Sequence, residues 1–399
     1  MSRERVAVLF VDHATALGGA EQVLLTLLRD LDRTWLVPHV ATQPGALADA
    51  ARALGVAVHE LPLRRLRHPL AAWRLGRGAY GLRRLIRREA ITLVHANTVR
   101  ASLYASAALP ARGCGLVWYV HDIVPSGWFG RRMCRVSAAV IAVSAAVAAA
   151  LPCAAKVQVI SNGVHPEDFA ARRPTDAAQL RAQWGIPPDA TLVAQIARLQ
   201  PWKGQRDVIA VAEMLREAGD RLYVVIVGGD IFGDAAAYAE ELKAMIGRRH
   251  LAAHVRLVGH CDDIAAVLNA VDIVVHASDC EPFGMALIEA GAAARPVVAY
   301  ASGGVPEILR HEHTGLLVPA GDRAALAAAL RRLLRDPQLA RSLGAAARAE
   351  VQARFDARDM ARKVEAVYAR VLGVASDRGK RVASRAADAA DPAVRVVQG

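Results

Sequence analysis

Residues 272–301 read DIVVHASDCEPFGMALIEAGAAARPVVAYA and contain one complete strand–helix–strand unit. The two outer runs, DIVVHAS (272–278) and PVVAYA (296–301), are mostly apolar rather than alternating, which is typical of strands buried on both faces of a sheet. The residues between them carry a helical pattern that we expect to begin near Phe283. Two strands joined through a helix form a right-handed crossover in a parallel sheet, so this stretch predicts an α/β fold.

The same alternation continues in both directions and forms two series. The first series has predicted strands at 6–11, 36–42, 56–61, 91–96, 116–121, 138–144 and 156–161. The second has predicted strands at 191–197, 221–228, 255–259, 272–278, 296–301 and 314–319. A polar segment with several prolines, near 165–190, separates the two series and is typical of a linker. We therefore expect two doubly wound, Rossmann-like α/β domains, residues 1–170 and residues 171–355, that face each other across a cleft.

Two further segments follow the second series. Residues 356–372 contain a helical pattern and are expected to form a C-terminal helix that packs back on the first domain. Residues 373–399 are rich in Ala, Asp, Arg and Ser without clear periodicity, and we expect them to form a disordered tail.

The composition fits a large folded protein with an anionic partner. The chain has 399 residues, of which 54% are apolar and 22% are charged, so a sizeable core is possible and global disorder is excluded. The net charge is +12, and residues 1–170 hold 20 basic and 11 acidic side chains. A basic first half is typical of proteins that bind nucleic acid, a membrane surface or a phosphorylated substrate.

The cysteines and the apolar runs indicate a cytoplasmic protein. The five cysteines are odd in number and have no CxxC spacing, so we expect neither a disulfide framework nor a zinc site. The apolar run at 6–11 is too short for a signal peptide. Residues 136–155 carry no charge over a length that could span a membrane. Their Ala-rich composition instead favours a buried strand followed by a helix with Ser144 at its N-cap.

Two loops at predicted strand ends carry groups suited to a diphosphate. Gly18 and Gly19 precede a helix, where backbone N–H groups and the helix dipole favour an anion; an ordinary strand–helix turn is the alternative. The loop lacks GxGxxG, which argues against a nicotinamide dinucleotide site. In ARLQPWKG (197–204), Arg198 and Lys203 follow a predicted strand and could neutralise a departing diphosphate, with plain surface charge as the alternative.

Residues 278–309 hold the densest set of candidate ligand groups. Glu281 lies on the loop before the predicted helix and Glu289 lies within it, and carboxylates are good partners for hydroxyl groups. In SGGVPE (302–307), two glycines precede a proline, which predicts a second helix start able to bind an anion. Free first-turn donors are expected at the backbone N–H groups of Phe283, Gly284 and Met285.

Five segments together resemble the signature series of the retaining GT-B glycosyltransferases, in the large fourth family that uses nucleotide sugars. They are GGAE (18–21), ARLxxxKG (197–204), EPFGxxxIEA (281–290), SGGVPE (302–307) and TGLLVPAGD (314–322). The segments occur in this order, and the resemblance covers about residues 5–370. EPFG followed by the second Glu is highly specific, whereas GGAE and TGLLV are weak alone. Two departures are Ala197, where Gly is common, and Ala294-Arg295, which replaces the usual Gly-containing turn.

The resemblance implies a binding role for residues on both sides of the cleft. Arg198 and Lys203 would bind the donor diphosphate, which Gly18 and Gly19 would meet from the first domain. The segment Gly259-His260 would lie beside the base of the nucleotide.

The resemblance also implies which groups would hold the sugars. Glu281 would contact hydroxyls of the transferred sugar, and Glu289 would bind the ribose. His121 would lie near the transferred sugar, and the catalytic set would be His121, Arg198, Lys203 and Glu281. The backbone amides that assist Glu281 would be those of Phe283, Gly284 and Met285.

The implied activity is transfer of a hexose-type sugar from a UDP- or GDP-linked donor to a glycan or lipid-linked acceptor, as in polysaccharide biosynthesis. The anomeric configuration would be retained, with no metal or other cofactor. A double-displacement route needs a carboxylate beneath the anomeric carbon, and no residue is assigned to that role. A same-face route, in which the leaving phosphate helps to deprotonate the acceptor, is the alternative. A sugar-nucleotide epimerase of the same fold and a non-catalytic basic membrane adaptor stay open.

Residues 64–88 are a candidate membrane contact, because they hold nine Arg and no acidic residue. Aromatic side chains among arginines suit an anionic bilayer surface, and related enzymes often dock this domain on membranes. We therefore expect peripheral contact with the inner face of a membrane rather than with nucleic acid; a solvated basic face is the alternative. On a helical projection Trp73 and Tyr80 lie among the arginines, opposite Leu75, Ala79, Leu82, Leu85 and Ile86.

Four histidines attract attention by their position. His95 and His121 both end predicted strands, and a lone histidine is usually structural. His121, which is followed by an acidic residue, is the better functional candidate. His311 and His313 have no evident third ligand, so no zinc site is predicted there.

Overall fold

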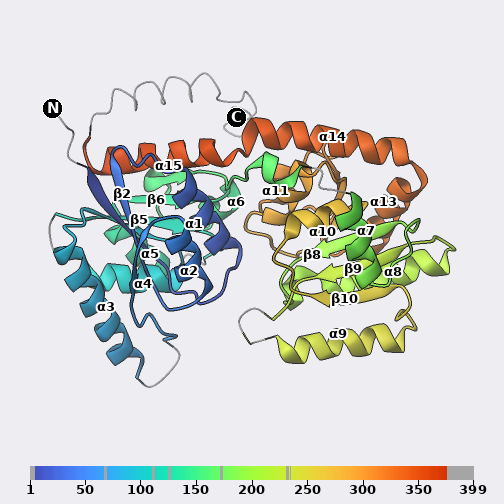
Figure 1. The fold of residues 1–399 in the computed structure, drawn as a ribbon, viewed down its shortest axis with the longest axis horizontal. Coiled ribbons are helices and arrows are strands. Elements are labelled where there is room, and N and C mark those ends of the chain that lie inside the picture. The colour runs from blue at the N-terminus through green and yellow to red at the C-terminus, as the bar shows by residue number, and fades with distance from the viewer. Residues whose placement is uncertain are drawn as a thin grey trace.

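The computed structural model describes residues 5–66, 70–109, 113–124, 127–170, 174–230, 233 and 235–374. Figure 1 shows two α/β domains side by side. All thirteen predicted strands are present, each within two residues of its predicted ends. The predicted disordered tail lies almost wholly outside the described residues.

The N-terminal domain contains a seven-stranded sheet in the order β3-β2-β1-β4-β5-β6-β7, with parallel pairing throughout. Its strands are β1 (Val6–Val11), β2 (Leu36–Thr42), β3 (Ala57–Glu60), β4 (Leu93–Ala96), β5 (Gly115–Val120), β6 (Ala139–Ala142) and β7 (Val157–Val159). Its helices are α1 (Gly19–Asp30), α2 (Ala46–Ala53), α3 (Ala71–Arg88), α4 (Val99–Ala108), α5 (Trp128–Val136) and α6 (Ala145–Ala149), with short 3-10 turns η1 (Ala154–Lys156) and η2 (Pro166–Phe169).

The C-terminal domain contains a six-stranded parallel sheet in the order β10-β9-β8-β11-β12-β13. Its strands are β8 (Leu192–Ile196), β9 (Tyr223–Val227), β10 (Val255–Gly259), β11 (Ile273–His276), β12 (Val297–Tyr300) and β13 (Leu316–Val318). Its helical elements are α7 (Pro174–Gln183), η3 (Pro201–Lys203), α8 (Gln205–Glu217), α9 (Ala236–Arg248), α10 (Ile264–Ala270), α11 (Met285–Ala292), α12 (Val305–Ile308), α13 (Arg323–Arg335) and α14 (Pro337–Arg354).

Both sheets are doubly wound, which confirms the predicted fold class. The strand order reverses between β1 and β4 in the first sheet and between β8 and β11 in the second. At such a reversal the flanking crossovers leave to opposite faces and open a crevice at the carboxyl ends of the strands. The topology therefore places one ligand-binding crevice on each domain.

The last helix, α15 (Ala357–Val371), returns to the N-terminal domain, as Figure 1 shows. The Tyr368 hydroxyl lies 2.7 Å from His95 Nδ1, and the Asp32 N–H donates to Glu365 at 2.7 Å. The chain thus crosses between the domains twice. The two crossings pair, because the Val164 N–H donates to the Phe355 carbonyl and Val164 accepts from Ala357, each at 2.9 Å.

The predicted linker near 165–190 is wrong in part, because it contains α7. The guanidinium of Arg181 donates to the Ala270 carbonyl at 2.7 Å and to Asp272 at 2.8 Å, which ties α7 to α10 and to the start of β11. Polarity and prolines suggested a linker, but a helix that needs only one packed face can be mostly polar. Helix α7 therefore belongs to the C-terminal domain.

The uncharged stretch at 136–155 forms β6 and α6, as predicted. The Ser144 hydroxyl accepts from the Val147 N–H at 3.1 Å and donates to the Pro282 carbonyl of the other domain at 2.6 Å. Both carboxylate oxygens of Glu307 accept N–H groups at the start of α6, from Ala145 and Ala146. Across the described ranges we find no helix with the length and apolarity that a membrane crossing requires.

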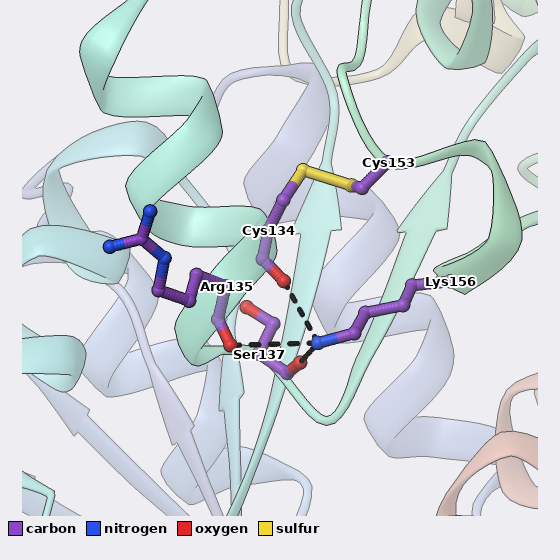
Figure 2. Close-up of a disulfide and its surroundings, with 5 residues drawn as sticks. All are labelled: Cys134, Arg135, Ser137, Cys153 and Lys156. Atoms are coloured by element: carbon purple, nitrogen blue, oxygen red, sulfur yellow. Dashed lines mark hydrogen bonds between the residues drawn. A yellow bond between two sulfur atoms is a disulfide. The ribbon is translucent and has the colours of Figure 1, made fainter.

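A disulfide joins Cys134 and Cys153, a single pairing that the expectation of no disulfide framework did not anticipate. The two residues are 19 apart in sequence and are brought together because the segment after α6 runs beside the end of α5 (Figure 2). Lys156 Nζ donates to the carbonyls of Cys134 and Ser137, each at 3.1 Å. This ammonium thus satisfies carbonyls at the end of α5 that the helix leaves free.

Candidate functional site

The two domains face each other across one cavity of about 1000 Å3. Loops at the carboxyl ends of strands from both sheets line it, including those that follow β1, β4, β8 and β11. The lining includes eleven predicted site residues, namely Gly18, Gly19, His121, Arg198, Lys203, His260, Glu281, Phe283, Gly284, Met285 and Glu289. Gly259, the remaining predicted residue, does not line the cavity but precedes His260, which does.

The C-terminal wall centres on a buried ion pair. Lys203 Nζ donates to Glu281 Oε2 at 2.7 Å, and their side chains are 13% and 7% exposed. His276 Nε2 lies 3.0 Å from the same oxygen. Burial alone would raise the pKa of Glu281, but Lys203 and His276 outweigh it and hold that pKa well below its usual range. Glu281 is therefore an ionised acceptor, suited to sugar hydroxyls.

The loop that carries Arg198 and Lys203 is fixed by buried amides. Gln195 Nε2 donates to the Lys203 carbonyl at 2.6 Å, and Gln205 Nε2 donates to the Arg198 carbonyl at 2.8 Å. Gly204 has φ 72, and a Cβ there would lie 1.9 Å from the Ala277 carbonyl oxygen. Only glycine lets this loop approach the end of β11 so closely, and that approach brings Lys203 to Glu281.

Helix α11 begins at Met285, two residues later than predicted, with Gly284 as its N-cap at φ 112. The left-handed cap ends the EPFG loop, and an α-helix leaves its first-turn N–H groups without intrahelical partners. Phe283, Gly284, Met285 and Ala286 line the same cavity as Glu281. Glu289 lies further along α11, and burial raises its pKa to about 7.

The SGGVPE segment supports Glu281 and does not form the predicted second anion site. Gly303 and Gly304 are absent from the described cavity lining, and α12 is only four residues long. The Gly304 N–H donates to the Glu281 carbonyl at 2.8 Å, and a Cβ on Gly303 would lie 2.1 Å from that oxygen. The two glycines therefore allow the loop to pack directly against the backbone of Glu281.

The N-terminal wall begins at the Gly18-Gly19 turn, where α1 starts. The Gly18 N–H donates to Glu21 Oε2 at 2.9 Å. The side chain of Glu21, in the first turn of α1, thus binds the N–H of the N-cap residue, as in a capping box. Burial, with a contribution from the charge of Asp12, raises the pKa of Glu21 to about 8. The Gly19 position lies close to the C-terminal domain, because a Cβ there would be 3.8 Å from Met285 Cγ.

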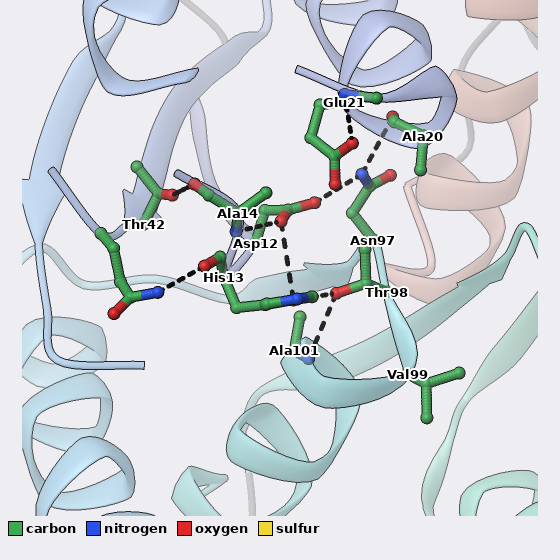
Figure 3. Close-up of polar contacts among 12 residues, drawn as sticks. Asp12, His13, Ala14, Ala20, Glu21, Thr42, Asn97, Thr98, Val99 and Ala101 are labelled. Carbon is green, nitrogen blue, oxygen red and sulfur yellow. Dashed lines mark hydrogen bonds and ion pairs between the residues drawn. The ribbon is translucent and has the colours of Figure 1, made fainter. Parts of the chain in front are cut away.

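His121 is positioned by a buried polar chain. Its Nε2 lies 3.1 Å from Asn97 Oδ1, and Asn97 Nδ2 donates to Asp12 Oδ2 at 2.7 Å and to the Ala20 carbonyl at 3.1 Å. Figure 3 shows Asn97 between Asp12 and Ala20. Burial lowers the pKa of His121 to about 3, so the imidazole is neutral near pH 7 and acts through hydrogen bonds.

Sequence reasoning missed three residues of the site: Asp12, Asn97 and His276. Each is a polar residue at or just after the end of an apolar strand run, and the three strands flank the two strand-order reversals. A systematic search of strand ends would have found them.

His95, His311 and His313, the other histidines that the sequence singled out, do not line the cavity. His95 is fully buried and paired with Tyr368, as expected of a structural histidine. His311 Nδ1 accepts the Leu317 N–H at 3.0 Å. Among the residues with described positions, no three His, Cys, Asp or Glu side chains are grouped so that they could hold a metal ion.

Two family models match the chain one after the other. Residues 17–168 match Glycosyltransferase Family 4, and residues 176–350 match Glycosyl transferases group 1. Two facing doubly wound domains with a shared cleft form the GT-B fold, and the two family models identify the class as glycosyltransferases. The chain belongs to the group 1 glycosyltransferases of this class.

Individual relatives agree with this assignment. One relative is a D-inositol 3-phosphate glycosyltransferase from Streptomyces bingchenggensis, to which the chain is 37% identical over 198 residues. The match covers 48% of this chain and 43% of the relative. The chain is 28% identical over 217 residues, 54% of each chain, to an N-acetyl-alpha-D-glucosaminyl L-malate synthase from Bacillus anthracis. The chain thus spans about half the length of the curated relatives it matches.

Similarity to solved structures extends over nearly the whole chain. A crystal structure of HepE from Anabaena in complex with UDP-glucose is 26% identical, with a TM-score of 0.82. The match covers 92% of this chain and 100% of the Anabaena chain. A second structure of HepE, with UDP and glucose, matches with a TM-score of 0.80 at the same identity, over 91% of this chain and 99% of that one.

Proposed function

We propose that this protein transfers a hexose-type sugar from a UDP- or GDP-linked donor to a glycan or lipid-linked acceptor, with retention of the anomeric configuration and without a divalent metal. The observation that carries the proposal is the Lys203–Glu281 pair, which joins the ARLxxxKG and EPFG motifs in one cleft. The HepE structure is described as a complex with UDP-glucose, so a UDP-linked hexose is the first donor to test.

Each group of the cleft has a role in this reaction. Arg198 and Lys203 would bind the donor diphosphate and stabilise its charge as the glycosidic bond breaks. Glu281 would accept hydrogen bonds from the transferred sugar, and Glu289 from the ribose. His121, neutral and fixed through Asn97, would orient the sugar by hydrogen bonding rather than as a cation. The base of the donor nucleotide would lie near Gly259-His260.

Retention would follow a same-face route. The acceptor hydroxyl would approach from the side on which the diphosphate departs, and the departing phosphate oxygen would take its proton. The protein would then contribute positioning and stabilisation of the leaving group, while the closed cleft excludes water. The contacts of Ser144 and Glu307 across the domain boundary would hold the two faces at a defined separation.

Calorimetric titration with UDP, GDP and their hexose conjugates, in the presence of EDTA, tests the donor site. We expect one nucleotide to bind selectively to the wild type and to lose about tenfold or more in affinity in Lys203→Gln, because a charged hydrogen bond is lost. Lys243→Gln is the matched control, since Lys243 lies on the exposed face of α9. No binding of any donor to the folded wild type would overturn the proposal. Formation of an epimerised sugar nucleotide without acceptor would favour the epimerase.

The proposed membrane contact rests on α3. Trp73 and Tyr80 are 60% and 70% exposed, and the Arg77 guanidinium lies 5.6 Å from the centre of a Trp73 ring. The opposite side of α3 is buried. Gly78 lets the helix pack against the Tyr104 ring, because a Cβ on Gly78 would lie 2.4 Å from Tyr104 Cε1. We expect the wild type to sediment with anionic vesicles and a Trp73→Ala/Tyr80→Ala variant to lose this binding. Tighter binding to nucleic acid than to anionic vesicles would contradict it.

A further inference from the structure

The start of α6 is the point at which the N-terminal domain holds the loop that carries Glu281. Ser144 is fully buried, follows β6 and donates its hydroxyl to the Pro282 carbonyl at 2.6 Å. Pro282 directly follows Glu281 in the chain. A side chain of the N-terminal domain therefore binds the backbone next to the carboxylate that would contact the transferred sugar.

The C-terminal domain holds the same loop from its other side. The Gly304 N–H donates to the Glu281 carbonyl at 2.8 Å. A Cβ on Gly304 would lie 2.6 Å from the Pro282 carbonyl oxygen and 3.2 Å from Ser144 Cβ, so only glycine leaves room for the Ser144 hydroxyl to reach that carbonyl. The successive carbonyls of Glu281 and Pro282 thus each accept a hydrogen bond, and the second bond comes from the other domain.

Glu307 adds a further contact across the domain boundary, at the first turn of α6. Its two carboxylate oxygens accept the N–H groups of Ala145 and Ala146 at 2.7 and 2.9 Å. The Ser144 hydroxyl supplies a third acceptor to the same turn. Helix α6 has only five residues, and a helix that short depends on partners for its first N–H groups. Separation of the domains would remove two of these three acceptors, and α6 is therefore best ordered while the domains are docked.

The start of α6 is also bonded to the strand that leads to His121. The Val143 N–H donates to the carbonyl of Val120, the last residue of β5, at 3.2 Å. His121 directly follows this strand, and Ser144 directly follows Val143. Two hydrogen bonds between backbone neighbours thus connect His121 on the N-terminal wall with Glu281 on the C-terminal wall. These are the two side chains that would hold the transferred sugar.

We propose that Ser144 and Glu307 are positioning residues that couple the docking of the two domains to the place of the Glu281 carboxylate. The inference deepens the proposed function and rests on it, because Glu281 has a sugar to contact only if the chain binds a nucleotide sugar. In the docked state the backbone beside Glu281 is held by both domains, and after separation the bond from Ser144 is lost. The donor sugar would then be bound correctly only in a cleft that excludes water, which limits hydrolysis of the donor.

Hydrogen exchange of the full chain, followed by mass spectrometry, tests the coupling without a ligand. We expect Ser144→Ala to speed exchange about tenfold at the start of α6 and also in the peptide that contains Gly304, because the backbone beside Glu281 is no longer held by the other domain. Faster exchange that stays confined to α6 would overturn the inference. Glu307→Gln removes one acceptor and the charge but keeps Ser144, and it gives the same test with a milder change.

The matched control for exchange is Asp322→Ala, which removes a helix cap that makes no contact between the domains. Asp322 is the N-cap of α13 and accepts the Ala325 N–H at 2.9 Å. Its replacement should speed exchange at the start of α13 and leave the peptide that contains Gly304 as in the wild type. Equal acceleration of that peptide in Asp322→Ala and Ser144→Ala would show a general loss of stability and would overturn the inference.

Calorimetric titration with the nucleoside diphosphate that the wild type selects, and with its hexose conjugate, tests the consequence for the site. In Ser144→Ala and in Glu307→Gln we expect the nucleoside diphosphate to bind within about threefold of the wild type, because Lys203 is retained. The hexose conjugate should bind about tenfold or more weakly, because Glu281 no longer meets the sugar hydroxyls at the right distance. The double variant should lose little more than the more affected single variant, since both residues act on one contact.

The control for binding is Glu312→Gln, since Glu312 is an exposed carboxylate that pairs with Arg332 of its own domain. It should bind both ligands as the wild type does. Equal losses for the nucleoside diphosphate and its hexose conjugate in the Ser144 and Glu307 variants, or no loss for either ligand, would overturn the positioning role. A wild type that binds neither ligand contradicts the proposed function instead, while its exchange pattern still shows whether Ser144 holds the loop of Glu281.

Discussion

The buried pair of Lys203 and Glu281 gives the most demanding test of the site. Replacement of Lys203 by Met removes the ammonium and keeps most of the side-chain length. It leaves the Glu281 carboxylate, 7% exposed, with His276 at 3.0 Å as its remaining side-chain partner. Breaking one side of a buried ion pair costs about 3–5 kcal/mol, because an uncompensated charge stays buried.

The expected cost converts to a large thermal shift. For a domain of about 150–250 residues, 1 kcal/mol corresponds to about 2–4 °C in Tm, so the transition of the C-terminal domain should fall by about 6–20 °C. Lys243→Met is the control, because Lys243 and Glu240 form a pair at 2.8 Å whose side chains are 62% and 72% exposed. An exposed pair contributes about 0–1 kcal/mol, so its loss should hardly move the transition.

A double variant separates stability from donor binding. In Lys203→Met/Glu281→Met both charges are absent, and replacement of a whole buried pair by apolar side chains is often neutral. The double variant should therefore recover most of the stability that the single variant loses, while nucleotide binding stays weak. Differential scanning calorimetry and nucleotide titration on the same samples measure both quantities.

The pH dependence of the single variant provides a second readout. Without Lys203, burial is opposed by His276 alone, so the pKa of Glu281 rises and this carboxyl protonates at a higher pH than in the wild type. The loss of stability in Lys203→Met, relative to the wild type, should then become smaller as the pH falls, since a neutral carboxyl costs less to bury. The reasoning is refuted if the single variant melts together with the wild type, or if the double variant is no more stable than the single one.

Three further predictions address the loop beside Glu281, the N-terminal wall and the disulfide. Gly303→Ala should lower the free energy of unfolding by about 1–3 kcal/mol in a urea titration, because φ is 53 and a Cβ would lie 2.1 Å from the Glu281 carbonyl oxygen. Glu21 has a pKa raised from 4.5 to about 8, so wild-type stability should fall as the pH rises through that window, and Glu21→Gln should flatten the fall measured by urea unfolding. Cys134→Ser should cost about 3 kcal/mol in non-reducing buffer, because the bond to Cys153 closes a loop of 19 residues.

Each of these predictions has a control on the same chain. Gly321 has positive φ with open space around it, so Gly321→Ala should cost less than the change at Gly303. Glu240→Gln, at an exposed position, should leave the pH profile unchanged. Cys114 is a free cysteine, and Cys114→Ser should not reproduce the loss. Equal effects in variant and control would contradict the corresponding argument.

The local sequence pattern predicted the strands correctly but did not predict which segments contact one another in the folded protein. Every strand run was identified because a strand buried on both faces must be continuously apolar. The linker near 165–190 was misread because polarity does not reveal whether a helix finds a neighbour, and α7 finds α10. The disulfide was missed because Cys134 and Cys153 meet only after β6 and β7 pair.

By itself the sequence determined two parallel-sheet domains and the loops that carry charge, since both follow from periodicity and from residue type at strand ends. Tertiary structure alone decided which of those loops meet. It joined Glu281 to Lys203, which is 78 residues away in sequence, and to His276, which is 5 residues away. It packed Gly303 against the Glu281 carbonyl and brought Arg65, Arg100 and His13 to the lining of one cavity. The physical reason is that hydrogen bonds and charges act over a few ångströms in space, and strand order, which local pattern does not encode, sets those distances.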